Sequence, residues 1–320
     1  MPRVKNEFVR FLRDMYSVEQ QAISQLVMAP IAAGDGRLAG DLRQHCRETE
    51  GHLRRIRERL KAHDTSILAL RGAAMKLGAK APILFAITQP ETPRKLILHS
   101  FSYEAMEWAG YEILRRLAQF ADDDQTVNVA CAIRDEEIVM MKRLEHDFDS
   151  AEEASHKNKS NTKMGFYLQR HLRETYALEN RSANLLMRVK TIGKDPQFSG
   201  VCQLHFEQAL VHARLLKEQI ESSGRKRPRF ADNVLAVEGW TRNLFFRLHA
   251  NYSAKIAIFI YAHEQLKAAS YELLQRTAKR AKNQEVQDLS QKLIEQQRLM
   301  ADRVAGTFDS VVEEILRTAR

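Results

Sequence analysis

The chain has 320 residues, of which 44% are hydrophobic and 28% charged, so it holds enough apolar residues for a packed core and is not a disordered chain. Only 13 glycines and 7 prolines are present, which favours helices over strands joined by tight turns. The 50 basic and 41 acidic residues leave a net charge of +9, yet they are interleaved along the sequence, so nucleic-acid binding is not expected.

Apolar residues recur at helical spacing through most of the chain. Helices are predicted in the first half over 6–28, 36–62, 93–120 and 124–148. Helices are predicted in the second half over 164–190, 195–223, 249–280 and 283–317. Pro93 suits the first position of a helix, and the acidic run 122–124 suits a helix N-terminus. We therefore expect an all-α protein.

A long connection separates the second helix from the third in each half. The first connection contains Pro82 and Pro90 and is expected to hold one or two short helices. The second opens with a basic loop that contains Arg225 and Arg229. The polar, charged segment 153–163 is the best candidate for a linker, and it divides the chain into predicted domains at residues 1–152 and 164–320.

The two halves come into register when the chain is shifted by 160 residues. Residues 12–20 (LRDMYSVEQ) then lie over 172–180 (LRETYALEN), and Glu104 lies over Glu264. The matching positions include polar residues at core spacing on the first three helices of each half. A repeat of this kind predicts two tandem four-helix units.

Carboxylates occupy the stripe of each first-half helix where a four-helix bundle needs apolar residues. Glu19 lies on this stripe in the first helix, and the second helix carries a glutamate and two histidines on one face. The third and fourth helices each carry an inward glutamate with a second glutamate nearby. The candidate metal ligands are Glu19, Glu48, His52, Glu104, Glu107, Glu136 and Glu137.

Burying several carboxylates together is unfavourable unless positive charge neutralises them. Two divalent metal ions held by facing helices would do so, as in di-iron and di-manganese carboxylate bundles. Oxygen ligands with an imidazole suit iron or manganese better than a metal that prefers thiolates. We therefore expect a dinuclear site in the first half, with Glu104 or Glu137 as the bridging ligand.

Each of these residues also has a simpler interpretation. A single glutamate on a helix stripe is more often salt-bridged to a nearby arginine, and His45 taken alone is typical of a core or boundary histidine. The alternative function is a metal-free helical adaptor or stress protein that binds anionic partners through a basic surface. The two hypotheses differ in whether the inner carboxylates and His52 converge or arginines fill the space between them.

Four motifs together resemble a known family. They are D-x-Y-x-x-E over 14–19, H-x-x-E-T-E-G-H over 45–52, E-x-x-E-x-A-x-Y over 104–111, and the glutamate pair at 136–137. They resemble the YciF-type ferritin-like family, also called domain of unknown function 892. The resemblance covers most of residues 5–150 and returns more weakly over 165–317.

The resemblance implies two tandem ferritin-like four-helix bundles that form a fused pseudo-dimer, in a cytoplasmic protein linked to bacterial stress responses. Family members are often dimeric, so the resemblance also allows a homo-oligomer. Iron storage needs a cage of repeating subunits, and a fused pair would disrupt its assembly. Glu48 and His52 are four residues apart rather than the usual three, which argues against conventional ferroxidase or peroxidase chemistry. The leading hypothesis is oxygen or peroxide chemistry at iron or manganese. No catalytic residue or organic cofactor is assigned. The sequence does not decide whether the protein is an enzyme.

The second half keeps Glu179, His212 and Glu264 but loses other acids. Glutamine or lysine stands at 208, 267, 296 and 297, where the first half has glutamate. We therefore expect a degenerate second copy in which the Lys267 ammonium lies among Glu179 and Glu264 and replaces the charge of a metal. His263 is the alternative replacement ligand.

The three cysteines, Cys46, Cys131 and Cys202, form no Cys-x-x-Cys pair, so neither a disulfide framework nor a zinc knuckle is expected. The N-terminal residues contain no apolar segment, so no secretory signal is expected. No run of about 18 apolar residues is present, so a membrane partner is not expected. These features favour a cytoplasmic protein.

Overall fold

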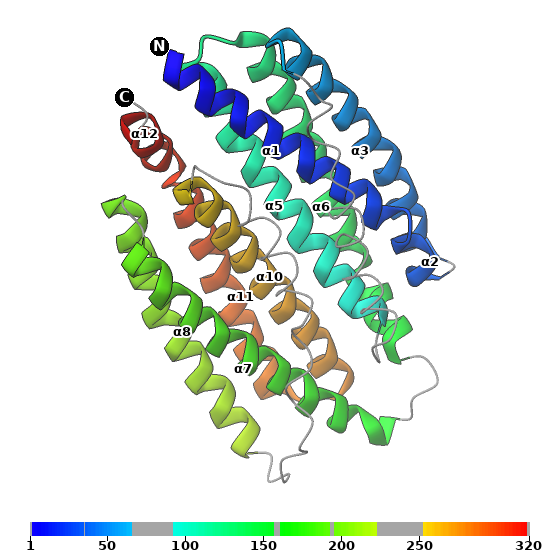
Figure 1. Cartoon of the computed structure of the whole chain (residues 1–320). Helices are drawn as coiled ribbons and strands as arrows, with labels where there is room; N and C mark the ends of the chain where they lie inside the picture. The colour runs from blue at the N-terminus through cyan, green and yellow to red at the C-terminus, as the bar shows by residue number, and fades with distance from the viewer. Residues whose placement is uncertain are drawn as a thin grey trace.

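The computed structural model describes residues 2–34, 36–65, 92–156, 161–192, 195–222 and 252–318. All regular structure in these ranges is helical (Figure 1), which confirms the expected all-α fold. The first half contains α1 (Pro2–Leu26), α2 (Ala29–Ala33), α3 (Arg37–Ala62), α5 (Thr92–Phe120) and α6 (Asp124–His156). The second half contains α7 (Asn161–Ile192), α8 (Pro196–Ser222), α10 (Tyr252–Arg280), α11 (Gln284–Ala305) and α12 (Phe308–Thr318).

Each half closes into a four-helix bundle. In the first half α1 packs against α3, α3 against α6, α6 against α5, and α5 against α1. In the second half α7, α8, α11 and α10 pack in the same cycle. Because every helix turns one face toward the enclosed space, polar residues on the inner faces of four helices are brought together.

The turns repeat with the 160-residue shift expected from the sequence. Asp122 and Lys282 adopt positive φ, of 55° and 54°, in the turn before the last long helix of each bundle. The next side chain caps that helix in both halves: Asp123 and Asn283 each accept a hydrogen bond, at 3.0 and 2.9 Å, from the backbone N–H group three residues later. The two halves are therefore copies of one structural unit.

The halves pack together through α5 and α10, which are equivalent helices and run side by side through the middle of the molecule (Figure 1). Two ion pairs cross this junction, Arg116 with Asp309 and Arg276 with Asp149. A shift of 160 residues converts the first pair into the second. Such reciprocal contacts are expected when two copies are related by an approximate two-fold axis.

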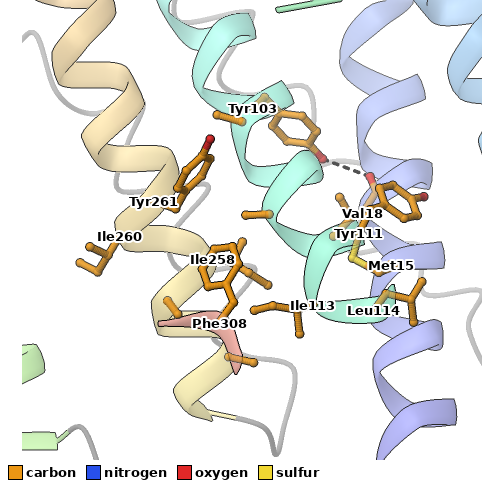
Figure 2. Packing of buried hydrophobic residues seen from close by; sticks show 14 of the residues in the cluster. Met15, Val18, Tyr103, Tyr111, Ile113, Leu114, Ile258, Ile260, Tyr261 and Phe308 are labelled. Atoms are coloured by element: carbon orange, nitrogen blue, oxygen red, sulfur yellow. Dashed lines mark hydrogen bonds between the residues drawn. The ribbon is translucent and has the colours of Figure 1, made fainter. Parts of the chain in front are cut away.

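Apolar side chains fill the space on both sides of α5. Ile113 and Ile258 lie between α5 and α10, and both belong to the main hydrophobic core (Figure 2). On the other side, Gly110 allows α1 to approach closely, because a Cβ there would lie 2.7 Å from Met15 Sδ. This close approach holds Glu19, one turn beyond Met15 on α1, beside α5.

Several boundaries differ from those predicted. α6 continues to His156 and α7 begins at Asn161, so residues 153–156 and 161–163 of the expected linker are helical. The last predicted helix is divided between α11 and α12 at Gly306, because glycine is unfavourable inside a helix. The connections that contain Pro82, Pro90 and the Arg225–Arg229 loop lie outside the described residues.

The described helices were compared with membrane-spanning helices by their length and hydropathy. None of these helices combines the length and the apolar character that crossing a bilayer requires.

The junction between the halves can be tested at Trp108, whose ring stacks on Tyr261 with the ring centroids 4.7 Å apart. Trp108→Ala should lower the free energy of unfolding by about 3 kcal/mol, because it removes a large aromatic contact between α5 and α10. Urea denaturation followed by circular dichroism measures the change. The control is Phe120→Ala, a residue 54% exposed, which should change the value by less than about 0.5 kcal/mol. Equal losses in the two variants would contradict this account of the junction.

Candidate metal centre

The four helices of the first bundle turn acidic side chains and histidines toward its centre. These residues are Glu19 from α1, His45 and His52 from α3, Glu104 and Glu107 from α5, and Glu137 from α6. Each of them is at most 2% exposed. Seven residues make about two turns of helix, so the imidazoles of His45 and His52 both lie on the inner face of α3.

One group of ligand atoms surrounds His45. Its Nε2 atom lies 2.7 Å from Glu104 Oε2 and 3.9 Å from Glu137 Oε2. One ligand atom from each of His45, Glu104, Glu107 and Glu137 lies within 4.8 Å of the others. The group therefore has the spacing and the burial of a site that could hold one metal ion.

A second group surrounds His52. Its Nδ1 atom lies 3.0 Å from Glu137 Oε1 and 3.5 Å from Glu19 Oε1. Ligand atoms of Glu19, His52 and Glu137 also lie within 4.8 Å of one another. The hydroxyl of Tyr111 donates a hydrogen bond to Glu19 Oε1, which orients this carboxylate within the group.

Glu137 belongs to both groups. Its Oε1 atom is the one nearest His52, and its Oε2 atom is the one that faces His45. A carboxylate that turns one oxygen toward each of two groups has the orientation of a bridging ligand in dinuclear carboxylate sites. The two groups therefore share one carboxylate, Glu137.

The outer nitrogen of each histidine faces a second carboxylate. Glu48 Oε2 lies 3.5 Å from His45 Nδ1, and Glu136 Oε2 lies 2.8 Å from His52 Nε2. Donation from the outer N–H of His52 to Glu136 leaves the lone pair of the inner nitrogen for a metal, as in carboxylate–histidine–metal triads. Contact with the histidine holds the pKa of each outer carboxyl at about 2.

The inner carboxylates outnumber the basic side chains that face them: four glutamates lie around the imidazoles of His45 and His52. Both oxygens of Glu107 lack a hydrogen-bond partner in the described part of the chain. Burial raises the pKa of Glu107 well above its usual value, and the neighbouring Glu19 and Glu137 raise it further. Burial likewise raises the pKa of Glu137. Divalent ions would remove this penalty, because they would neutralise the ionised carboxylates.

The structure divides the candidate ligands predicted from the sequence into an inner and an outer set. It brings together Glu19, His52, Glu104, Glu107 and Glu137. It places Glu48 and Glu136 outside the inner groups, where arginines pair with them: Arg143 lies 2.9 Å from Glu48, and Arg55 lies 2.7 Å from Glu136.

The sequence taken alone predicts that His45 is a core or boundary histidine; the structure buries it and places it among the inner carboxylates. The available signal was its separation of seven residues from His52, about two helical turns.

The centre of the second bundle is built differently. Lys267 occupies the position equivalent to Glu107, and its Nζ atom lies 3.1 Å from Glu179 Oε2 and 3.2 Å from Glu264 Oε2. The expected position of Lys267 is therefore confirmed. When all are ionised, the four inner carboxylates of the first bundle carry a charge of −4, whereas the two carboxylates and one ammonium of the second carry −2 + 1 = −1. Gln297, at the position of Glu137, donates a hydrogen bond to Glu264.

Comparison with known proteins identifies the family. The family model described as "Domain of unknown function (DUF892)" matches residues 3–155 and again residues 166–317. The chain therefore belongs to this family and contains two copies of its domain, as the resemblance and the tandem repeat predicted. No curated protein and no solved structure matches the chain.

The contribution of the Lys267 ammonium to the stability of the second bundle can be tested by Lys267→Met. At neutral pH this change should lower the free energy of unfolding by about 3 kcal/mol, because it leaves Glu179 and Glu264 buried without a cation. Adding Glu264→Gln should recover part of the loss. Chemical denaturation of the three proteins measures both effects, with Lys279→Met at an exposed position of α10 as the control.

The pH dependence of this loss has a defined direction. Burial alone would raise the pKa of Glu179 and Glu264, but Lys267 together with the neighbouring histidines outweighs burial, and both pKa values lie below the usual range. The stabilisation is therefore present above the pKa of about 4.5 expected for an unfolded glutamate and is lost as the pH falls further. The difference between wild type and Lys267→Met should shrink on acidification. A difference that is zero at neutral pH, or that grows in acid, would contradict this role of Lys267.

Proposed function

We propose that this member of the DUF892 family holds two iron or manganese ions in its first bundle and uses them for chemistry with oxygen or peroxide. The observation that carries the proposal is the position of Glu137, whose two oxygens face two different histidines. One shared carboxylate between two His–Glu groups is the pattern of dinuclear carboxylate proteins. A single structural ion would not need the second group.

The residues present fit two such ions. His45, Glu104 and Glu107 would hold one ion and Glu19 and His52 the other, with Glu137 shared between them. The donors are carboxylate oxygens with one imidazole for each ion, a set that suits iron and manganese and lacks the thiolates that softer metals prefer. Two divalent cations would also balance the charge of −4 on the four inner carboxylates.

Bound iron or manganese would supply electrons to oxygen or peroxide, or accept them. The chain's own residues support this chemistry by fixing the ligands before any metal binds. Glu136 lies at hydrogen-bond distance from the outer nitrogen of His52, Glu48 faces the outer nitrogen of His45, and Tyr111 donates a hydrogen bond to Glu19. Burial of all the inner ligands keeps bulk water away, so charges at the centre act on one another at low dielectric.

A small pocket beside Glu104 supports a substrate of a few atoms. It is lined by residues of α1, α2 and α5. They include Ala22, Gln25, His99, Tyr103 and Glu104. The pocket reaches a carboxylate of the inner group, so it offers a small molecule such as oxygen or peroxide a way toward the centre.

The alternative function, a metal-free adaptor for anionic partners, rests on a basic surface. Its clearest element, the loop with Arg225 and Arg229, lies outside the described residues. In the described part of the chain, Arg55 and Arg143 contact the outer carboxylates, and the inner acids converge around the histidines. This placement favours the metal hypothesis.

The second bundle provides the substitutions that test metal binding. Glu107→Lys/Glu137→Gln gives the first bundle the residues that the second has at these positions. Wild type grown with iron and manganese, or reconstituted with either ion, should bind about two equivalents more than the double variant, which should bind almost none at this centre. The variant without metal should be at least as stable as metal-free wild type, because a cation then compensates the remaining acids.

Elemental analysis and thermal unfolding with and without metal measure both effects. The matched control, Glu50→Lys/Glu153→Gln, makes the same chemical changes at exposed positions of α3 and α6 and should keep the metal. Wild type that binds less than about a tenth of an equivalent of iron or manganese would contradict the proposal and favour the adaptor.

Reactivity needs a separate measurement. Wild type loaded with iron(II) should oxidise it in air, and protein loaded with manganese should consume peroxide, at least about tenfold faster than Glu107→Lys/Glu137→Gln under the same conditions. Optical detection of iron(III) and of residual peroxide gives the rates, and free metal provides the background. Full metal occupancy with rates at background would leave the metal site intact and overturn the redox part of the proposal.

A further inference from the structure

A separate group of ligand residues lies where α6 ends and α7 begins. Glu152 and His156 are one turn apart on α6, His171 lies on α7, and Thr277 lies on α10. Their exposed fractions are 0%, 5%, 1% and 0%. α6 belongs to the first bundle, whereas α7 and α10 belong to the second, so the group spans the junction between the two copies.

The side chains of this group converge. One ligand atom from each of Glu152, His156 and His171 lies within 4.8 Å of the others. His156 Nε2 lies 2.9 Å from Glu152 Oε1, and the rings of His156 and His171 have centroids 5.7 Å apart. The spacing of four residues on α6 places Glu152 and His156 on the same helix face.

Thr277 orients two members of the group. Its Oγ1 atom lies 2.6 Å from His171 Nδ1, at hydrogen-bond distance, and donates a hydrogen bond to Glu152 Oε1. When the single hydroxyl proton goes to Glu152, Oγ1 can only accept from His171, and Nδ1 of His171 carries the proton. A histidine whose one nitrogen donates to a fixed acceptor is set in the tautomer and orientation that metal binding needs.

Other polar atoms of the group are buried without a hydrogen bond. Among the described residues, Glu152 Oε2 and His156 Nδ1 have no hydrogen-bond partner. Leaving such atoms unpaired inside a protein is costly, and most buried polar groups are satisfied. A cation bound beside Glu152 and His156 would give these unpaired atoms a partner.

The repeat shows that the fold does not require polar residues at these positions. The residues displaced by 160 from the four members are apolar, and all are buried in the main hydrophobic core. They are Val312, Leu316, Phe11 and Leu117. The same structural positions are thus filled by hydrocarbon at one end of the junction and by two imidazoles, a carboxylate and a hydroxyl at the other.

We propose that Glu152, His156 and His171 form a mononuclear site for one divalent transition-metal ion, which ties the end of the first bundle to the second. Two imidazoles and one carboxylate form a borderline donor set that zinc, cobalt(II) and iron(II) accept. The ligands lie on both sides of the connection between α6 and α7, so the bound ion fixes the two bundles to each other. The site shares no residue with the dinuclear centre, and its existence does not depend on the proposed function of that centre.

Metal titration of a variant with an altered dinuclear centre tests this site. Glu107→Lys/Glu137→Gln is titrated with cobalt(II), whose visible absorption reports imidazole coordination, and with zinc in competition. The expected result is one equivalent bound per chain and a rise in the melting temperature. His156→Ala in this background should weaken cobalt(II) binding by more than about tenfold, and Thr277→Val should weaken it by about tenfold by releasing His171.

The other end of the junction supplies a matched variant that should fold. It carries the apolar residues of the equivalent positions: Glu152→Val, His156→Leu, His171→Phe and Thr277→Leu. This variant should be at least as stable as its parent in chelator and should bind no cobalt(II). His146→Ala, an exposed histidine on the same helix, should leave binding unchanged.

Two outcomes would overturn the proposal. The first is a parent variant that binds less than about a tenth of an equivalent of cobalt(II) and of zinc. The second is equal binding by the parent and by the variant with the apolar residues, which would place the ion elsewhere on the surface. Failure of the dinuclear centre to bind metal would affect neither measurement, because that centre is altered in every protein of the series.

Discussion

Four carboxylates in the first bundle have been taken out of water and placed within a few ångströms of one another. Their mutual repulsion and lost hydration must be offset by positive charge or by protons, and the rest of each bundle centre is arranged around that need. In the second bundle Lys267 offsets the charge from within the chain. In the first bundle the imidazoles of His45 and His52 face the four acids, and both oxygens of Glu107 lack a hydrogen-bond partner among the described residues.

The two copies therefore share a scaffold and differ in the charge at its centre. Tyr111 donates to Glu19, and Tyr271 donates to Glu179 at the equivalent position. His212 keeps the place of His52, with a glutamine in contact with its outer nitrogen instead of a glutamate. Because the framework is retained where the acids are lost, it contributes to the packing of both bundles.

The junction between the two halves likewise combines symmetric contacts with one end at which the two copies differ. The reciprocal ion pairs and the packing of α5 on α10 use equivalent residues of the two copies. Symmetry is broken where the chain passes from α6 to α7. The Glu152 and His156 side chains there replace Val312 and Leu316 of the other end. A duplicated chain can vary one end of such a junction independently, because the second copy no longer has to be identical to the first.

Spacing along a helix is a local property, and for that reason the sequence alone predicted the helices, the 160-residue repeat and the inward acids such as Glu19. It also predicted Lys267 between two carboxylates, because the repeat assigned it the place of Glu107. Sequence spacing could not separate Glu136 from Glu137, which are adjacent and differ only in which one the rotation of α6 turns inward. It likewise could not decide which carboxylate meets the inner nitrogen of a histidine. Only the packing of the helices determines which of these side chains come together, and it also brings together the residues from α6, α7 and α10. The sequence does not reveal this, because distances between helices depend on contacts between residues far apart in the chain.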